Sequence, residues 1–127
     1  MVNVVAAVIR RGDKMLICRR PQGKNLAGYW EFPGGKIEGG EDGSSALVRE
    51  CREELGITVS VGRKICVLTH DYASFSVKIA FYECEVSSGE PAAVEHSEIR
   101  WVLPGELKDY EFCPADSELI KMLSEQE

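Results

Sequence analysis

Three glutamates, Glu50, Glu53 and Glu54, lie close together in a segment with helical periodicity. At about 100° per residue, their carboxylates project from one arc of that helix, and like charges one turn apart destabilise a helix by about 0.2–0.5 kcal/mol. We therefore expect a positive partner among them. For an arbitrary helix, the ordinary alternative is an acidic face in solvent, partly neutralised by Arg49 and Arg52. The residues around this helix favour a chemical role instead.

The predicted helix ends at Leu55 and has recognisable signals at both ends. Ser44 or Ser45 can cap its first turn, and Gly56 follows its last residue, where a left-handed conformation is common. Ahead of the helix, Gly34 and Gly35 predict a turn. An apolar stripe that can face a core is formed by Leu47, Cys51 and Leu55.

Strands are predicted on both sides of this helix, at residues 2–9, 14–19, 29–32, 58–70, 75–86 and 99–103. The first is a continuous apolar run that suits a strand buried on both faces, and a turn at 11–13 joins it to the second as a hairpin. A helical turn is expected at 104–107, and a final amphipathic helix, capped by Asp116 or Ser117, extends through Leu123. This order predicts a mixed sheet with helices on its faces.

Length, composition and charge limit the kinds of protein this chain can be. Its 127 residues, 44% of them hydrophobic, fit a single domain spanning residues 1–127. No apolar run is long enough to span a membrane, and the N-terminal segment lacks the basic region of a signal peptide, so we predict a cytoplasmic protein without membrane contact. The net charge of −6 argues against stable nucleic-acid binding but allows an anionic small molecule. The five cysteines, with no C-x-x-C pair, predict reduced thiols.

A fixed pattern of residues connects the glycine turn to the helix. The pattern is G-x5-E-x7-R-E-U-x-E-E-x-G-U, where U is a bulky apolar residue, and it is matched by Gly35, Glu41, Arg49, Glu50, Cys51, Glu53, Glu54, Gly56 and Ile57. It closely resembles the Nudix box, and Cys51 is its only soft match. The segments 18–20 and 30–38 are similar to the MutT branch of the Nudix family, and the resemblance extends from Val4 to about Leu123.

The resemblance implies an α/β class protein with the Nudix fold, an α/β/α sandwich around a mixed β-sheet. It also implies hydrolysis of a nucleoside diphosphate linked to another moiety, with Mg²⁺ as cofactor and Mn²⁺ as an alternative. By similarity, the metal ligands are Glu50, Glu53, Glu54 and the backbone carbonyl of Gly34. Oxygen ligands of this kind suit a hard cation that binds both a phosphate chain and water.

Other roles are assigned by similarity or by local chemistry. Arg49, one helical turn before Glu53, and Glu41, just ahead of the helix, are expected to organise the site together with Gly35. The general base is left open between Glu50 and Glu95. A surface position is the simpler interpretation of Glu95, and a structural role that of His96.

Phosphate and base contacts are expected from residues outside the box. Arg20 and Lys36 are the predicted phosphate ligands, whereas Arg19 and Lys24 are expected to point to solvent. Tyr72 and Val77 resemble residues that line the base pocket of MutT-type enzymes. Asp116 stands where some of these enzymes have a base-reading asparagine, and an ionised aspartate could only accept hydrogen bonds. Helix capping is the ordinary alternative role for Asp116.

The predicted function is an Mg²⁺-dependent nucleoside triphosphate pyrophosphohydrolase that releases nucleoside monophosphate and pyrophosphate and sanitises the nucleotide pool. An 8-oxo-dGTP preference competes with a preference for CTP or a modified dCTP. Two further alternatives are another nucleoside-diphosphate-linked substrate and a non-catalytic nucleotide-binding domain. The chain could act as a monomer or a homodimer.

Overall fold

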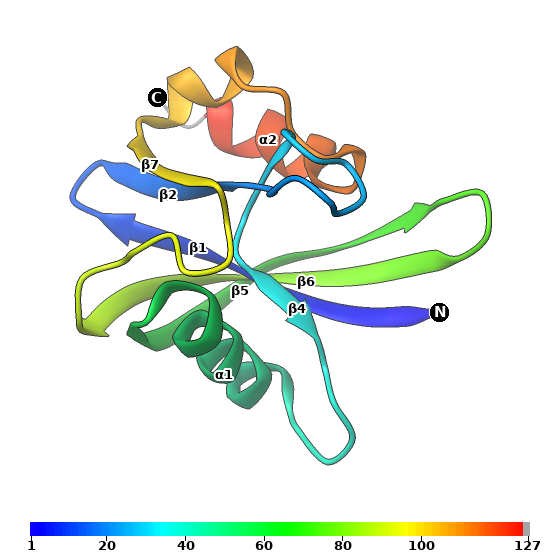
Figure 1. Cartoon of the computed structure of the whole chain (residues 1–127), viewed down its shortest axis with the longest axis horizontal. Helices are drawn as coiled ribbons and strands as arrows, with labels where there is room; N and C mark the ends of the chain where they lie inside the picture. Colours follow the sequence, from blue (N-terminus) through cyan, green and yellow to red (C-terminus); the bar gives the residue numbers. More distant parts are fainter. Residues whose placement is uncertain (126–127) are drawn as a thin grey trace.

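The computed structural model describes residues 1–125 and has a mixed β-sheet at its centre (Figure 1). The central strand, β1 (Val2–Arg11), runs parallel to β6 (Ser76–Ser88), and β6 pairs with the antiparallel edge strand β5 (Thr58–Asp71). Along its other edge, β1 pairs antiparallel first with β4 (Gly34–Lys36) and then with β2 (Lys14–Arg19). The predicted hairpin of β1 and β2 is confirmed.

The sheet continues beyond β2 on both of that strand's edges. Here β2 pairs antiparallel with β3 (Trp30–Glu31) and with β7 (Glu98–Val102). The strand β1 is therefore shared by the two parts of the sheet, one built on β6 and β5 and the other on β2, β3 and β7.

Helices cover both faces of this sheet (Figure 1). The helix α1 (Gly43–Leu55) lies on one side, and α2 (Ser117–Ser124), with the 3-10 helices η1 (Pro104–Asp109) and η2 (Pro114–Asp116), lies on the other. In β1, alternate residues face the two layers because successive side chains of a strand point to opposite faces. Val5, Ala7 and Ile9 pack in the core under α1, whereas Ala6 and Val8 pack in the core under α2. The predicted α/β/α sandwich with a mixed sheet is confirmed, and the single domain over residues 1–127 stays a prediction.

The start of α1 differs from the predicted start, and its end agrees with the prediction. Asp42, and not Ser44 or Ser45, is the capping residue, because its carboxylate accepts a hydrogen bond from the backbone N–H of Ser45 at 2.7 Å. At the other end, Gly56 is left-handed with φ of 70°, and its N–H bonds the carbonyl of Arg52 at 3.1 Å.

The predicted turn at Gly34 and Gly35 is wrong, because both residues belong to β4 and pair with Ala6 and Val5 of β1. Glycine is needed at both positions because the backbone of β4 lies very close to neighbouring groups. A Cβ on Gly34 would collide with the carbonyl oxygen of Val5, and a Cβ on Gly35 would lie 2.5 Å from the carboxyl carbon of Glu50. Side chains are therefore excluded where β4 passes between β1 and α1.

The capping interpretation of Asp116 is also wrong. Asp116 stands at the N-cap position of α2, but its side chain makes no capping hydrogen bond and is buried instead. The five cysteines are free thiols. None of the helices in residues 1–125 has the length and apolar content needed to cross a bilayer.

Candidate active site

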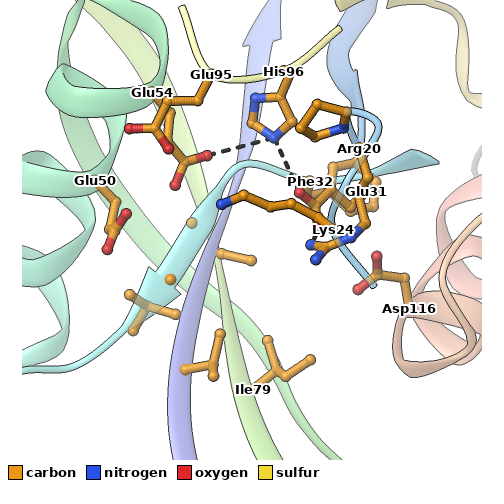
Figure 2. Close-up of a pocket in the computed structure, with 16 residues that line it drawn as sticks. Arg20, Lys24, Glu31, Phe32, Glu50, Glu54, Ile79, Glu95, His96 and Asp116 are labelled. Atoms are coloured by element: carbon orange, nitrogen blue, oxygen red, sulfur yellow. Dashed lines mark hydrogen bonds and ion pairs between the residues drawn. The ribbon is translucent and has the colours of Figure 1, made fainter. Parts of the chain in front are cut away.

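A cavity of about 310 Å³ lies between α1, the start of β1 and the loop before β3 (Figure 2). We call it the acidic cavity, because five of its lining residues carry carboxyl groups, namely Glu31, Glu50, Glu54, Glu95 and Asp116. Its basic lining residues are Arg20, Lys24 and His96, and Gly34 and Gly35 of β4 form part of its wall. The structure thus gathers residues from α1 and from six other segments of the chain around one space.

The three glutamates of α1 do not all face this cavity. Glu50 and Glu54 line it, whereas Glu53 is exposed and is not among the lining residues. The guanidinium of Arg49 explains this difference, because its Nη1 contacts a carboxylate oxygen of Glu50 at 3.1 Å and one of Glu53 at 3.4 Å. In this structure Glu53 is therefore turned toward Arg49.

Arg49 also joins the helix to the residues before it. It donates from Nε and Nη2 to both oxygens of Glu41, at 2.7 and 3.0 Å, and from Nη2 to the backbone carbonyl of Lys36 at 3.1 Å. The hydrogen bonds from Arg49 and from the backbone of Glu38 lower the pKa of Glu41 to about 2. One guanidinium thus fixes α1 against β4 and the loop that follows it.

Glu54 is the most deeply buried carboxyl group of the helix, with 6% of its surface exposed. Burial, a hydrogen bond with Glu50 and the negative charges of Glu50, Glu31 and Glu95 raise the pKa of Glu54 well above its usual range. A bound cation would relieve the repulsion among these negative charges.

His96 and Glu95 come from one loop and line the cavity beside Glu54 of α1 (Figure 2). The imidazole of His96 is almost completely buried; its Nε2 lies 3.0 Å from Glu31 Oε2 and 3.6 Å from Glu54 Oε1. Glu95 is exposed and lines the cavity near Glu54.

The predicted phosphate ligands lie in different places. Arg20 lines the cavity, where it donates from Nη1 to Glu31 Oε1 at 2.9 Å and from Nε to the carbonyl of Asn25 at 2.6 Å. Lys36 is exposed and is not brought into the cavity. Lys24 is exposed, as expected, and its side chain also extends along the cavity (Figure 2).

A second cavity, of about 520 Å³, adjoins the first and contains the predicted base-pocket residues. We call it the apolar cavity, since it is lined by Leu26, Tyr72, Phe75, Val77, Cys113 and Ala115 besides the polar residues at its border. The ring of Tyr72 stacks on Phe75 with centroids 5.2 Å apart, and Val77 is buried in the wall. Tyr72 and Val77 thus share one space with Asp116, as the resemblance implied.

The two cavities share their border residues, which are Val4, Arg20, Glu31, Ile79 and Asp116. Burial and the negative charge of Glu31 raise the pKa of Asp116 well above its usual range, although Arg20 opposes this shift. A neutral carboxylic acid has one O–H donor and one carbonyl acceptor. The ionised form assumed from the sequence only accepts hydrogen bonds, whereas the raised pKa favours the neutral acid, which can also donate.

A layered α/β fold, a helix with paired carboxyl groups and an adjoining apolar pocket define a hydrolase of the kind that acts on small phosphorylated molecules. The model of the NUDIX domain matches residues 4–122, so the chain belongs to the Nudix family and is a Nudix hydrolase. The resemblance seen in the box is confirmed.

Curated relatives and solved structures agree with this assignment. The chain is 38% identical over 121 residues to the CTP pyrophosphohydrolase of Escherichia coli, covering 95% of this chain and 90% of that protein. It is 32% identical over 123 residues to the 8-oxo-dGTP diphosphatase of the same species, covering 96% and 95%. The solution structure of the E. coli ORF135 protein superposes with a TM-score of 0.83 at 38% identity, covering 95% of this chain and 86% of that one.

Nudix hydrolases use a divalent metal, and the carboxyl groups here suit one in their chemistry. Glu50 and Glu54 both line the cavity, and Gly35 leaves room for the carboxylate of Glu50. Within residues 1–125, however, no three acidic, histidine or cysteine side chains converge on a common metal position. The carboxylate of Glu53 lies outside the cavity, where it contacts Arg49 at 3.4 Å.

Three cavity residues were not predicted as functional from the sequence: Glu31, Lys24 and His96. Glu31 stands within the segment that resembles the MutT branch, and that position is the one signal that could have identified it. Lys24 and His96 lie in loops, where no periodic pattern indicates which way a side chain points.

Proposed function

We propose that this chain is an Mg²⁺-dependent nucleoside triphosphate pyrophosphohydrolase that removes damaged or surplus nucleotides from the pool. The observation that carries the proposal is the shared border of the two cavities, because it allows one molecule to place a base in the apolar cavity and phosphates in the acidic one. In the reaction, a water oxygen bonds to phosphorus and a P–O–P bridge breaks, which gives nucleoside monophosphate and pyrophosphate.

The proposed metal ligands are Glu50, Glu53, Glu54 and the carbonyl of Gly34, with Mg²⁺ as the natural ion and Mn²⁺ as a substitute. When bound, such a cation supplies charge neutralisation for the phosphates and makes the attacking water more acidic. Arg49 and Glu41 would act indirectly, since they position the helix carboxylates and β4.

Two residues compete as the general base. Glu50 accepts a hydrogen bond from Arg49 at 3.1 Å, so its carboxylate is already engaged. Glu95 lines the cavity, and no side-chain hydrogen bond or ion pair involves it within residues 1–125. We therefore favour Glu95 as the group that accepts the proton from water, and Glu50 as a ligand.

Phosphate binding is proposed for Arg20 and for Lys24. Arg20 lies at the border between the cavities, where the first phosphate of a nucleotide would follow its sugar. Lys24 lines the acidic cavity, and no ion pair within the described residues engages it. Lys36 remains a candidate for a phosphate that extends beyond the cavity.

The preferred base remains open between 8-oxoguanine and cytosine. We propose that Asp116 reads the base edge and that Tyr72 and Val77 contact its faces. As a neutral acid, Asp116 offers the same donor and acceptor pair as the asparagine found in some MutT-type enzymes, which supports the 8-oxo-dGTP reading. The 38% identity to a CTP pyrophosphohydrolase supports CTP or a modified dCTP.

A panel of triphosphates assayed with Mg²⁺ tests the proposal. We expect pyrophosphate and monophosphate as products and a kcat/KM advantage of tenfold or more, about 1.4 kcal/mol, for one base. Glu54→Gln should lower kcat by about 100-fold or more, because a buried ligand is lost, whereas the exposed Lys14→Met at the β1–β2 turn should retain activity.

Other outcomes of the same panel would point to the alternatives. A sugar phosphate among the products would favour another nucleoside-diphosphate-linked substrate. Nucleotide binding without turnover of any panel member would favour a non-catalytic domain and contradict the proposal. We further propose a cytoplasmic location, which the free cysteines support, and a monomer or homodimer.

A further inference from the structure

His96 lines the acidic cavity, at a position that neither the Nudix box nor the proposed chemistry explains. It lies in the loop before β7, and both sides of this loop are fixed by backbone hydrogen bonds. The N–H of Ser97 bonds the carbonyl of Arg19 at 3.0 Å, and the N–H of Ala92 bonds the carbonyl of Leu55 at 3.1 Å. The imidazole is thus held between the end of β2 and the end of α1.

The polar contacts of the ring are all on one side. Its Nε2 is 3.0 Å from Glu31 and 3.6 Å from Glu54, while Nδ1 is buried without a hydrogen-bond partner within the described residues. Nε2 is therefore the ring nitrogen that faces both acids. A buried nitrogen without a partner is costly, which indicates that the ring is kept for the contacts of Nε2.

These contacts form a continuous series across the site. Arg20 Nη1 donates to one oxygen of Glu31 at 2.9 Å, His96 contacts the other, and the same nitrogen of His96 reaches Glu54. Glu31 and Glu54 would otherwise face each other, and the charge of Glu31 contributes to the raised pKa of Glu54. An imidazole can donate one hydrogen without adding a fixed positive charge that would compete with a metal cation.

We propose that His96 is a positioning residue of the metal site, which fixes the carboxylate of Glu54 relative to Glu31 within the acidic cavity. The inference rests on the metal-dependent hydrolysis proposed above. It adds a residue that contacts neither the substrate nor the metal directly, but that determines where a ligand to the metal points.

The test compares two replacements of similar size, His96→Phe and His96→Gln. Phenylalanine fills the space without a donor, whereas the amide of glutamine can place a donor near the position of Nε2. The readout is Mn²⁺ binding to the protein alone, measured by electron paramagnetic resonance, so that turnover is not needed. We expect His96→Phe to raise the Kd for Mn²⁺ by about 10-fold and His96→Gln to remain close to the wild type.

A control and a second variant make the result decisive. His70→Phe replaces the other histidine, which packs on Tyr72 and touches no carboxylate, and it should leave Mn²⁺ affinity unchanged. If His96→Phe does not fold, His96→Asn serves in its place, since its shorter amide reaches only the position of Nδ1 and should also weaken binding. In a Glu31→Gln background the effect of His96→Phe should shrink, because one of the two partners is already changed.

Wild-type Mn²⁺ affinity in His96→Phe or His96→Asn would overturn the inference, as would equal losses in His96→Phe and His96→Gln. The proposed function can fail separately. If the wild type hydrolyses no triphosphate but these differences in Mn²⁺ binding persist, His96 positions a metal site whose reaction is a different one.

Discussion

Asp116 shows how a single side chain can combine a cost in stability with a role in recognition. It is 6% exposed, it caps no helix, and it lies beside Glu31 at the border of the two cavities. Ionising a carboxyl group in this position costs free energy. The neutral acid is the form that resembles an amide in its hydrogen bonding. Burial of Asp116 therefore favours the form of the side chain that we propose to read the base.

The raised pKa of Asp116 predicts a pH-dependent stability. The ordinary value is 3.8, so above about pH 4 the unfolded chain loses a proton that the folded chain keeps, and the free energy of unfolding falls as the pH rises toward the folded-state pKa. Asp116→Asn removes this titration. We expect the variant to be more stable than the wild type at neutral pH, with a difference in Tm that grows between about pH 4 and pH 8. Thermal unfolding followed by circular dichroism measures it, and a difference independent of pH would contradict the prediction.

For single residues, the sequence predicted the positions that follow from local spacing. It missed the positions that follow from tertiary contacts. Glu50 and Glu54 lie where the helical period places them, and Arg49 contacts Glu53 one turn away. His96 and Glu31 are 65 positions apart, and only the folded chain brings them together. The side-chain direction of Glu53 was also missed. The helical period gives the arc on which Glu53 lies, but it does not show that its carboxylate contacts Arg49 outside the cavity.

Among the elements, the short strand β4 has the greatest consequence for the site. It passes between β1 and α1, and each of its two glycines meets a different obstacle. The obstacle at Gly34 is backbone, which cannot move, whereas that at Gly35 is the end of the flexible Glu50 side chain. The sequence predicted a turn here because paired glycines are typical of turns, and the pairing with β1 is not encoded locally.

This difference predicts that alanine substitution affects stability at one of these glycines and catalysis at the other. Gly34→Ala should reduce the free energy of unfolding by about 1–3 kcal/mol, because its Cβ meets the backbone of β1. Gly35→Ala should fold normally but lose about 100-fold in kcat, because it displaces the carboxylate of Glu50. Urea unfolding and steady-state kinetics on both variants separate the two effects. Equal loss of stability in both would show that Gly35 also serves the fold.

The remaining elements were predicted with small errors at their ends. Strand β2 was predicted with its observed bounds. Strand β5 differs by one residue at its end, and β6 differs by one residue at its start and two at its end. The start of α1 was placed too late, since Asp42 and the serines are all capable caps and only the bond to Ser45 distinguishes them.

For the whole molecule, the net charge of −6 bears on what the site can attract. Within the acidic cavity, carboxyl groups outnumber the cationic side chains of Arg20 and Lys24. A nucleotide can enter this site with its own metal ion, but a polynucleotide needs an extended basic surface. The substrate is therefore expected to be a free nucleotide.

The charge distribution predicts the absence of stable nucleic-acid binding. A fluorescently labelled single-stranded oligonucleotide at about 0.15 M salt should show no change in anisotropy at protein concentrations of about 10 µM. Saturable binding under these conditions would contradict the prediction and would redirect the search for the substrate to polynucleotide ends.

The strand β1 has hydrogen-bonded neighbours on both edges and packed helices on both faces, and its residues Val4, Val5 and Ala6 form the floor of the acidic cavity. The walls of the apolar cavity come instead from the loop before β3, the tip of the β5–β6 hairpin and the segment before α2. A change in the floor would disturb every layer at once, whereas the walls tolerate substitution and insertion. New base preferences could therefore evolve, or be engineered, in the walls while the bond-breaking groups stay where they are.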